Sequence, residues 1–136
     1  MIQKLLITKN GMLIFNQRFY DCSLLLDNDL IISSYLSAIE TVSKLIIGKT
    51  IRSVNLDELT IHYYKDISDD TILFILFADS DDNVKDIKKK FKEIGDHFFK
   101  EFSIFLKKFN GDISKFQDFN NTLIHNHIVE NSCYNQ

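Results

Sequence analysis

Histidines are the residues of this chain whose types and spacing come closest to a chemical site. His125 and His127 could offer two imidazole ligands to a metal ion, with His97 as a third. Residues two apart point to different sides of a helix, and no cysteine or carboxylate completes a recognisable ligand spacing. His62 alternates with apolar neighbours in a strand-like run, which favours a solvent-facing or hydrogen-bonded role. We therefore expect no metal site.

Catalysis needs several polar groups that converge on one point, and the chain offers few. Tyr63 and Tyr64 beside His62 are not enough by themselves to form a catalytic site. Only four glycines are present and none begins a phosphate-binding loop, so nucleotide hydrolysis is not expected. We predict a protein that is not an enzyme and has no cofactor.

Carboxylates and lysines gather in two regions. The acidic residues are Asp66, Asp69, Asp70, Asp79, Asp81 and Asp82. They lack the ligand order and the glycine of a calcium loop, so we expect them to form turns and to cap a helix. The lysines at 88–90 lie opposite an apolar helix stripe, which favours a solvated face over contact with anionic lipid.

Composition excludes several classes of protein. The chain has 136 residues, 45% of them hydrophobic, a mean hydropathy of -0.08 and a formal net charge of -3. These values are typical of one globular domain and argue against general nucleic-acid binding. Cys22 and Cys133 fit no metal or redox spacing, which favours reduced thiols, although a disulfide stays open. No apolar run has the length of a signal peptide or membrane span, so we expect a cytoplasmic protein.

The elements that position these side chains begin with a hairpin and a helix. Apolar runs at residues 2–8 and 12–15 flank Asn10-Gly11, a pair suited to a tight turn. Residues 30–47 have helical spacing and end at Gly48. The side expected to face the sheet is Ile31, Tyr35, Ile39, Val42 and Ile46, and the opposite side is Ser33, Ser37, Glu40 and Lys44.

Three strand patterns and two helices follow. The strands are predicted at residues 51–55, 59–64 and 71–78. The run from Ile72 to Phe77 is apolar throughout, as is the middle of the first strand, so helices must cover both faces of the sheet. The strand predicted at residues 51–55 is polar, which is typical of the edge of a sheet. We expect a helix of about 26 residues from Val84 to Phe109, and then a last helix that opens with a capping box of Ser114 and Gln117.

The resulting ββαβββαα order resembles the longin domain, a profilin-like α+β module of trafficking-complex and adaptor small subunits. The resemblance covers residues 1–129, including the junction FLKKFNGDISKFQDF from Phe105 to Phe119, and leaves 130–136 as a frayed tail. It implies a five-stranded antiparallel sheet in the order 2-1-5-4-3, with one helix on one face and two on the other. The roadblock module is similar in its layers but opens with a helix, whereas this chain opens with a strand.

The resemblance implies a non-catalytic scaffold. Its expected partner is a longin or roadblock subunit or a small GTPase in membrane traffic or related regulation, with a homodimer as one alternative. Membrane contact is expected to be indirect or weak. The predicted partner surface combines the outer side of the first helix with the sheet edge, and its residues are Ser33, Ser37, Thr41, Lys44, Ile51, Arg52, Ser53 and Val54.

A small-ligand sensor is the alternative function. Profilin-like sheets rich in aromatic residues can hold an apolar ligand between sheet and helix. A ligand-sized cavity would favour the sensor, and a copurifying partner would favour the scaffold.

Overall fold

A five-stranded antiparallel sheet forms the centre of the computed structural model, which describes residues 2–19 and 29–129. The strands are β1 (Ile2–Lys9), β2 (Met12–Arg18), β3 (Ser53–Leu56), β4 (Leu59–Tyr64) and β5 (Ile72–Asp79). Their order in the sheet is β2-β1-β5-β4-β3, which confirms the predicted order 2-1-5-4-3. The predicted tail at residues 130–136, Cys22 and Cys133 lie outside the described residues.

The hairpin of β1 and β2 turns where the sequence predicts it. Asn10 has φ 50° and Gly11 has φ 81°, so both residues adopt the left-handed backbone that such turns require. Lys9 pairs with Met12 across the turn, and the register shifts between Ile7 and Thr8. The second strand continues to Arg18, three residues beyond the predicted end.

Strands β1 and β5 lie at the middle of the sheet, and both of their faces are covered. The side chains of Leu5, Leu6 and Ile7 are inaccessible to solvent, and every residue from Ile72 to Ala78 is buried. Alternate residues of each strand therefore belong to two different cores. This confirms that the uninterrupted apolar runs mark strands with helices on both sides.

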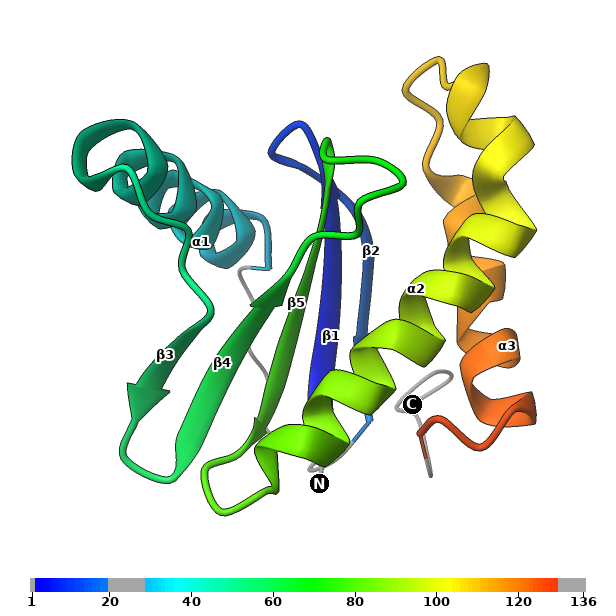
Figure 1. Cartoon of the computed structure of the whole chain (residues 1–136). Helices are drawn as coiled ribbons and strands as arrows, with labels where there is room; N and C mark the ends of the chain where they lie inside the picture. Colours follow the sequence, from blue (N-terminus) through cyan, green and yellow to red (C-terminus); the bar gives the residue numbers. More distant parts are fainter. Residues whose placement is uncertain (1, 20–28, 130–136) are drawn as a thin grey trace.

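One face carries two helices, α2 (Val84–Lys107) and the shorter α3 (Phe119–His125) (Figure 1). Asn83 caps α2, because its side-chain oxygen accepts a hydrogen bond of 2.8 Å from the Lys85 backbone N–H. The buried stripe of α2 repeats every three or four residues and is Ile87, Phe91, Ile94, Phe98, Phe102 and Leu106. Their spacing explains why one long helix can seal this core.

The junction between these helices differs from the prediction. Ser114 does not cap a helix: it lies inside a 3₁₀ turn, η2 (Ser114–Asp118), and its backbone N–H bonds to the Asp112 carboxylate at 3.0 Å. That carboxylate satisfies the donor that a capping box would have used, so the capping-box prediction is wrong. Helix α2 also ends two residues before Phe109.

The other face carries α1 (Asp29–Val42), which continues as a single π-helical turn, η1 (Ser43–Ile47) (Figure 1). Gly48 closes it with φ 76°, as the sequence predicts. The predicted inner side is wrong, because Tyr35, Val42 and Ile46 are exposed.

Polar contacts with β4 and with the residue after it explain how α1 is rotated. Among the α1 side chains that the structure describes, those of Leu36 and Glu40 are buried. The Tyr63 hydroxyl donates to the Leu36 carbonyl at 3.3 Å, and the Lys65 ammonium lies 3.0 Å from Glu40 Oε1. The second contact is an ion pair whose angles fall outside hydrogen-bond geometry. Both contacts hold the side of the helix that carries Glu40 toward the sheet.

Candidate functional site

An open groove of about 910 Å³ lies between the outer strands and the first half of α2. In Figure 1, α2 starts beside β5 and runs away from β4 and β3, so this face of the two outer strands has no helix over it. The lining residues come from β3, β4, the loop after β4 and α2. They are Arg52, Ser53, His62, Tyr63, Tyr64, Lys65, Asp66, Ile67, Ser68, Val84, Ile87, Lys88, Phe91, Lys92 and Asp96. The volume is within the range of ligand-binding pockets.

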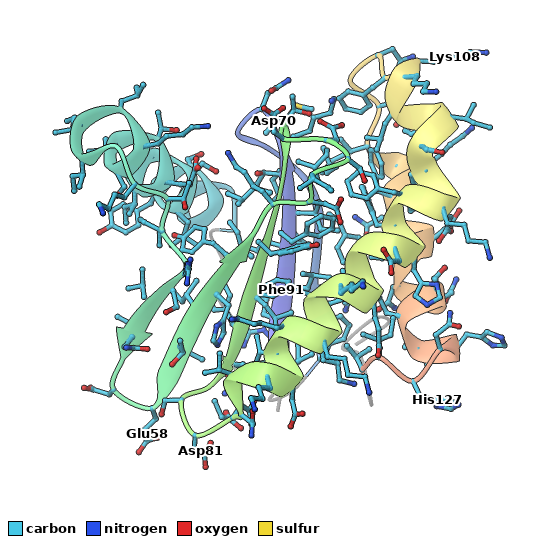
Figure 2. All side chains as sticks on the ribbon, viewed as in Figure 1. Glu58, Asp70, Asp81, Phe91, Lys108 and His127 are labelled. Carbon is cyan, nitrogen blue, oxygen red and sulfur yellow. The ribbon has the colours of Figure 1, made fainter. Side chains whose placement is uncertain are left out.

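Aromatic rings form the floor of the groove. Phe91 lies between α2 and the sheet, where Figure 2 labels it. Its ring stacks on Tyr64 with centroids 5.3 Å apart and an interplanar angle of 22°, and it meets the edge of His62 at 6.5 Å. Phe91 itself is buried, so the surface that these rings offer to an incoming side chain or ligand belongs to the half-buried His62 and Tyr64.

His62 is half-buried beneath the groove rather than solvent-facing. Burial lowers the pKa of its imidazole, and the nearby Asp82 carboxylate opposes that change. The ring is therefore neutral at neutral pH and acts as part of the aromatic floor.

A hydrogen-bonded carboxylate fixes one end of the groove. Asp66 accepts the Tyr64 hydroxyl at 3.0 Å, the Ser68 backbone N–H at 2.9 Å and the Ser68 hydroxyl at 2.7 Å. The backbone N–H of Ser68 is the main reason that the pKa of Asp66 lies below its usual value. Burial raises the pKa of Tyr64 to about 12, and the bond to Asp66 adds to this rise. The charged form of Asp66 thus holds Tyr64 in place against Phe91.

Strand β3 forms the border of the groove and the outer edge of the sheet. The Tyr63 N–H donates to the Arg52 carbonyl at 2.9 Å, and Ser53 stands opposite His62. Backbone groups alternate in direction along an antiparallel strand, so those of Ser53 and Asn55 point away from β4. Among the described residues, no strand pairs with that side of β3.

One half of the predicted partner surface lies at the sheet edge. Arg52 and Ser53 are exposed, and Ile51 and Val54 are partly exposed, at or beside the edge strand. The strand itself begins at Ser53, two residues later than predicted.

The helical half of that surface is less open than predicted. Thr41 and Lys44 are exposed on or after α1, whereas Ser37 is half-buried and its hydroxyl oxygen is enclosed without a hydrogen-bond partner. The side chain of Ser33 lies outside the described part of the structure. Ser37 is therefore not available as a small residue against which another helix could pack.

The acidic residues at the end of β5 and just after it stabilise the turn that follows. Carboxylate oxygens of Asp79, Asp81 and Asp82 lie within 4.8 Å of one another. The Gln3 amide donates to the Asp79 carboxylate, and the Asp82 N–H donates to the Asp79 carbonyl at 3.1 Å. These bonds fit the predicted role in turn formation.

Sequence reasoning missed the groove, although its residues were in view. The spacing predicts a helix over Phe91 and a strand over His62 and Tyr64, but it does not predict that these three side chains meet. The useful signal was the combination of a polar edge strand with aromatic residues on one side of its neighbour.

Comparison with known proteins adds no family. No protein-family model matches this chain, and no curated protein matches it. Membership of the longin family therefore stays a prediction that rests on the order of elements. None of the helices in the described residues is long and apolar enough to cross a membrane.

Proposed function

We propose that this protein is a non-catalytic interaction module that binds an extended segment of a partner protein along β3, with partner side chains in the adjoining groove. The observation that carries the proposal is the free edge of β3 beside that groove. Ser53 and Asn55 direct their backbone N–H and C=O groups outward, and Ser53 also lines the groove. Strand addition of this kind draws affinity from backbone hydrogen bonds and specificity from pockets for alternate side chains.

The groove lies where such alternate side chains would fall. Ser53 is opposite His62, and Asn55 is opposite Thr60, whose hydroxyl donates to the Asn55 side-chain oxygen at 3.2 Å. Cross-strand partners share one face, so these residues face the same side as the aromatic floor. A strand added about 4.8 Å beyond β3 would place every second side chain on this face, beside Ser53 and Asn55 at the border of the groove.

The resemblance to longin domains supplies the proposed class of partner. Such modules pair with longin or roadblock subunits or contact small GTPases in membrane traffic, and a scaffold of that type needs no catalytic group. This assignment of partner and process is a proposal, and the edge strand is the part of it that can be tested directly.

Replacing Ser53 tests the proposal. Ser53→Pro removes the outward N–H and places a ring on the edge, whereas Ser53→Ala keeps the N–H and is the matched control. We expect Ser53→Pro to lose the partner recovered by affinity purification and mass spectrometry, and Ser53→Ala to retain it. Both variants should unfold at the wild-type temperature within a few degrees, because that N–H makes no bond to β4. Retention of the partner by Ser53→Pro at wild-type levels would exclude strand addition.

A small-ligand sensor is the second candidate, and the groove volume of about 910 Å³ with its aromatic floor is the observation that favours it. A planar apolar ligand could stack beside Phe91 and Tyr64. Native mass spectrometry of the purified protein tests this function: a bound metabolite that Phe91→Ala releases would support the sensor. A ligand-free protein that still captures a partner would support the scaffold.

A further inference from the structure

The turn that ends α1 exposes three large aliphatic side chains in succession. Leu45 and Ile46 are each 78% exposed and Ile47 is 67% exposed, and none of the described residues covers them. We call residues 44–49 the apolar tip. In Figure 1 the end of α1 projects at the upper left, away from the sheet. Exposed apolar groups gathered in this way mark contact surfaces more often than chance.

The backbone holds the apolar tip in this shape. The N–H groups of Gly48 and Lys49 both bond to the Ser43 carbonyl, and Gly48 turns the chain back with φ 76°. A side chain at Gly48 would be strained at that φ whatever the space around it. The exposure of the aliphatic residues is therefore a property of a closed turn.

Charge in the chain segment that contains the apolar tip has one sign. Lys44 and Lys49 flank the aliphatic residues, and the sequence from 41 to 56 contains no aspartate or glutamate. This is unusual in a chain with 19 acidic residues and a net charge of -3. The complementary surface must be negatively charged at its boundary and apolar within.

The shape of the apolar tip selects among such surfaces. A π-helical turn has more residues per turn than an α-helix, so successive side chains point somewhat less than about 100° apart, and three in a row still spread over nearly half of the circumference. A groove or a flat protein surface contacts one side of such a turn, whereas lipid chains can surround all three side chains. A second copy of the chain is disfavoured, because a two-fold contact would bring Lys44 and Lys49 of both copies together without a carboxylate in the segment.

We propose that the apolar tip inserts into the surface of an anionic lipid bilayer. Leu45, Ile46 and Ile47 enter the boundary between headgroups and acyl chains, while Lys44 and Lys49 remain at the level of the lipid phosphates and carboxylates. This goes further than the indirect or weak membrane contact expected from the sequence. The surface is separate from the β3 edge, so the inference does not depend on the proposed function.

Vesicle sedimentation with the full chain tests the proposal. The probes are vesicles of phosphatidylcholine alone and of phosphatidylcholine with phosphatidylserine. We expect the protein to pellet with the anionic vesicles and to be released as salt is raised. Ile46→Asp should weaken binding at least about tenfold. Lys44→Gln together with Lys49→Gln should weaken it about thirtyfold, or about fivefold for each charge.

Ile104→Asp is the matched control, because Ile104 is also an isoleucine on a helix and is 73% exposed. Binding that survives Ile104→Asp and is lost in Ile46→Asp supports the proposal. Absence of binding to anionic vesicles, or equal binding by Ile46→Asp and wild type, overturns it. A dimer or a complex with another protein that Ile46→Asp dissociates, in a protein that does not bind vesicles, would assign the apolar tip to a protein contact and also overturn it. Ser53→Pro should leave vesicle binding unchanged.

Discussion

Removal of the Phe98 ring should destabilise the fold more than any other single truncation on α2. Phe98 is fully buried, and its ring lies 5.2–5.9 Å from those of Phe74, Phe99, Phe102, Phe116 and Phe119. These rings come from β5, α2, η2 and α3, so one side chain connects every layer on this face of the sheet.

The expected cost follows from that environment. Truncation of a buried phenylalanine to alanine costs about 3–5 kcal/mol, and lost ring contacts of about 0.5–1.5 kcal/mol each place Phe98→Ala at the upper end. A domain of this size has about 5–15 kcal/mol of stability in total. Phe98→Ala should therefore lower the urea midpoint sharply and lower Tm by roughly 10–20 °C.

Urea unfolding followed by circular dichroism measures the effect. Phe109→Ala is the control, because Phe109 is partly buried and contacts the rings of Phe105 and Phe116 at the edge of the same core. It should cost about 1–2 kcal/mol. If Phe98→Ala does not fold, Phe98→Leu should still show a loss of about 1–2 kcal/mol. A loss for Phe98→Ala below that of Phe109→Ala would refute the reasoning.

Three further predictions concern groups around the groove and α1. Burial raises the pKa of Tyr63 and of Tyr64 to about 12, so the folded state holds both protons more tightly; this stabilisation is complete below about pH 10 and is lost as the pH rises to about 12. Changing both tyrosines to phenylalanine should flatten the fall in Tm across that window, and an unchanged fall would contradict the assignment. Lys65→Met leaves the buried Glu40 carboxylate without its ion pair and should cost about 2 kcal/mol in urea unfolding, more than Glu40→Gln at about 1 kcal/mol. Gly95→Ala should raise stability by about 0.5–1 kcal/mol, since a Cβ there meets Asp66 and Tyr64 at ordinary contact distances of 3.4 and 3.5 Å; a lower Tm would show that the helix cannot accommodate it.

The sheet could be predicted because its central strands carry the information locally. The run Ile72 to Phe77 has no polar alternation, and this alone requires covered faces on both sides. Asn10-Gly11 and Gly48 adopt the left-handed backbone that their residue types suggest. These features depend on neighbours in sequence, which is why they were correct.

Other features depend on contacts between distant residues. The rotation of α1 is set by Tyr63 on β4 and by Lys65 just after that strand, and no periodicity within the helix reports a partner that lies about 25 residues away. The groove depends on the direction in which α2 leaves the sheet, which periodicity does not define. The helix and strand that carry the aromatic residues of the site could therefore be predicted from the sequence, but the contacts between those residues could not.

The position of β1 in the middle of the sheet affects how the chain can be made. Translation completes the β1–β2 hairpin at Arg18, but the other neighbour of β1 ends at Asp79. At about 5–20 residues per second, roughly 3–12 s separate the two events on the ribosome. During that interval, the side of β1 that will pair with β5 has unpaired backbone groups, and its aliphatic side chains are not yet covered. Chaperone binding should therefore be strongest between the synthesis of residues 18 and 79.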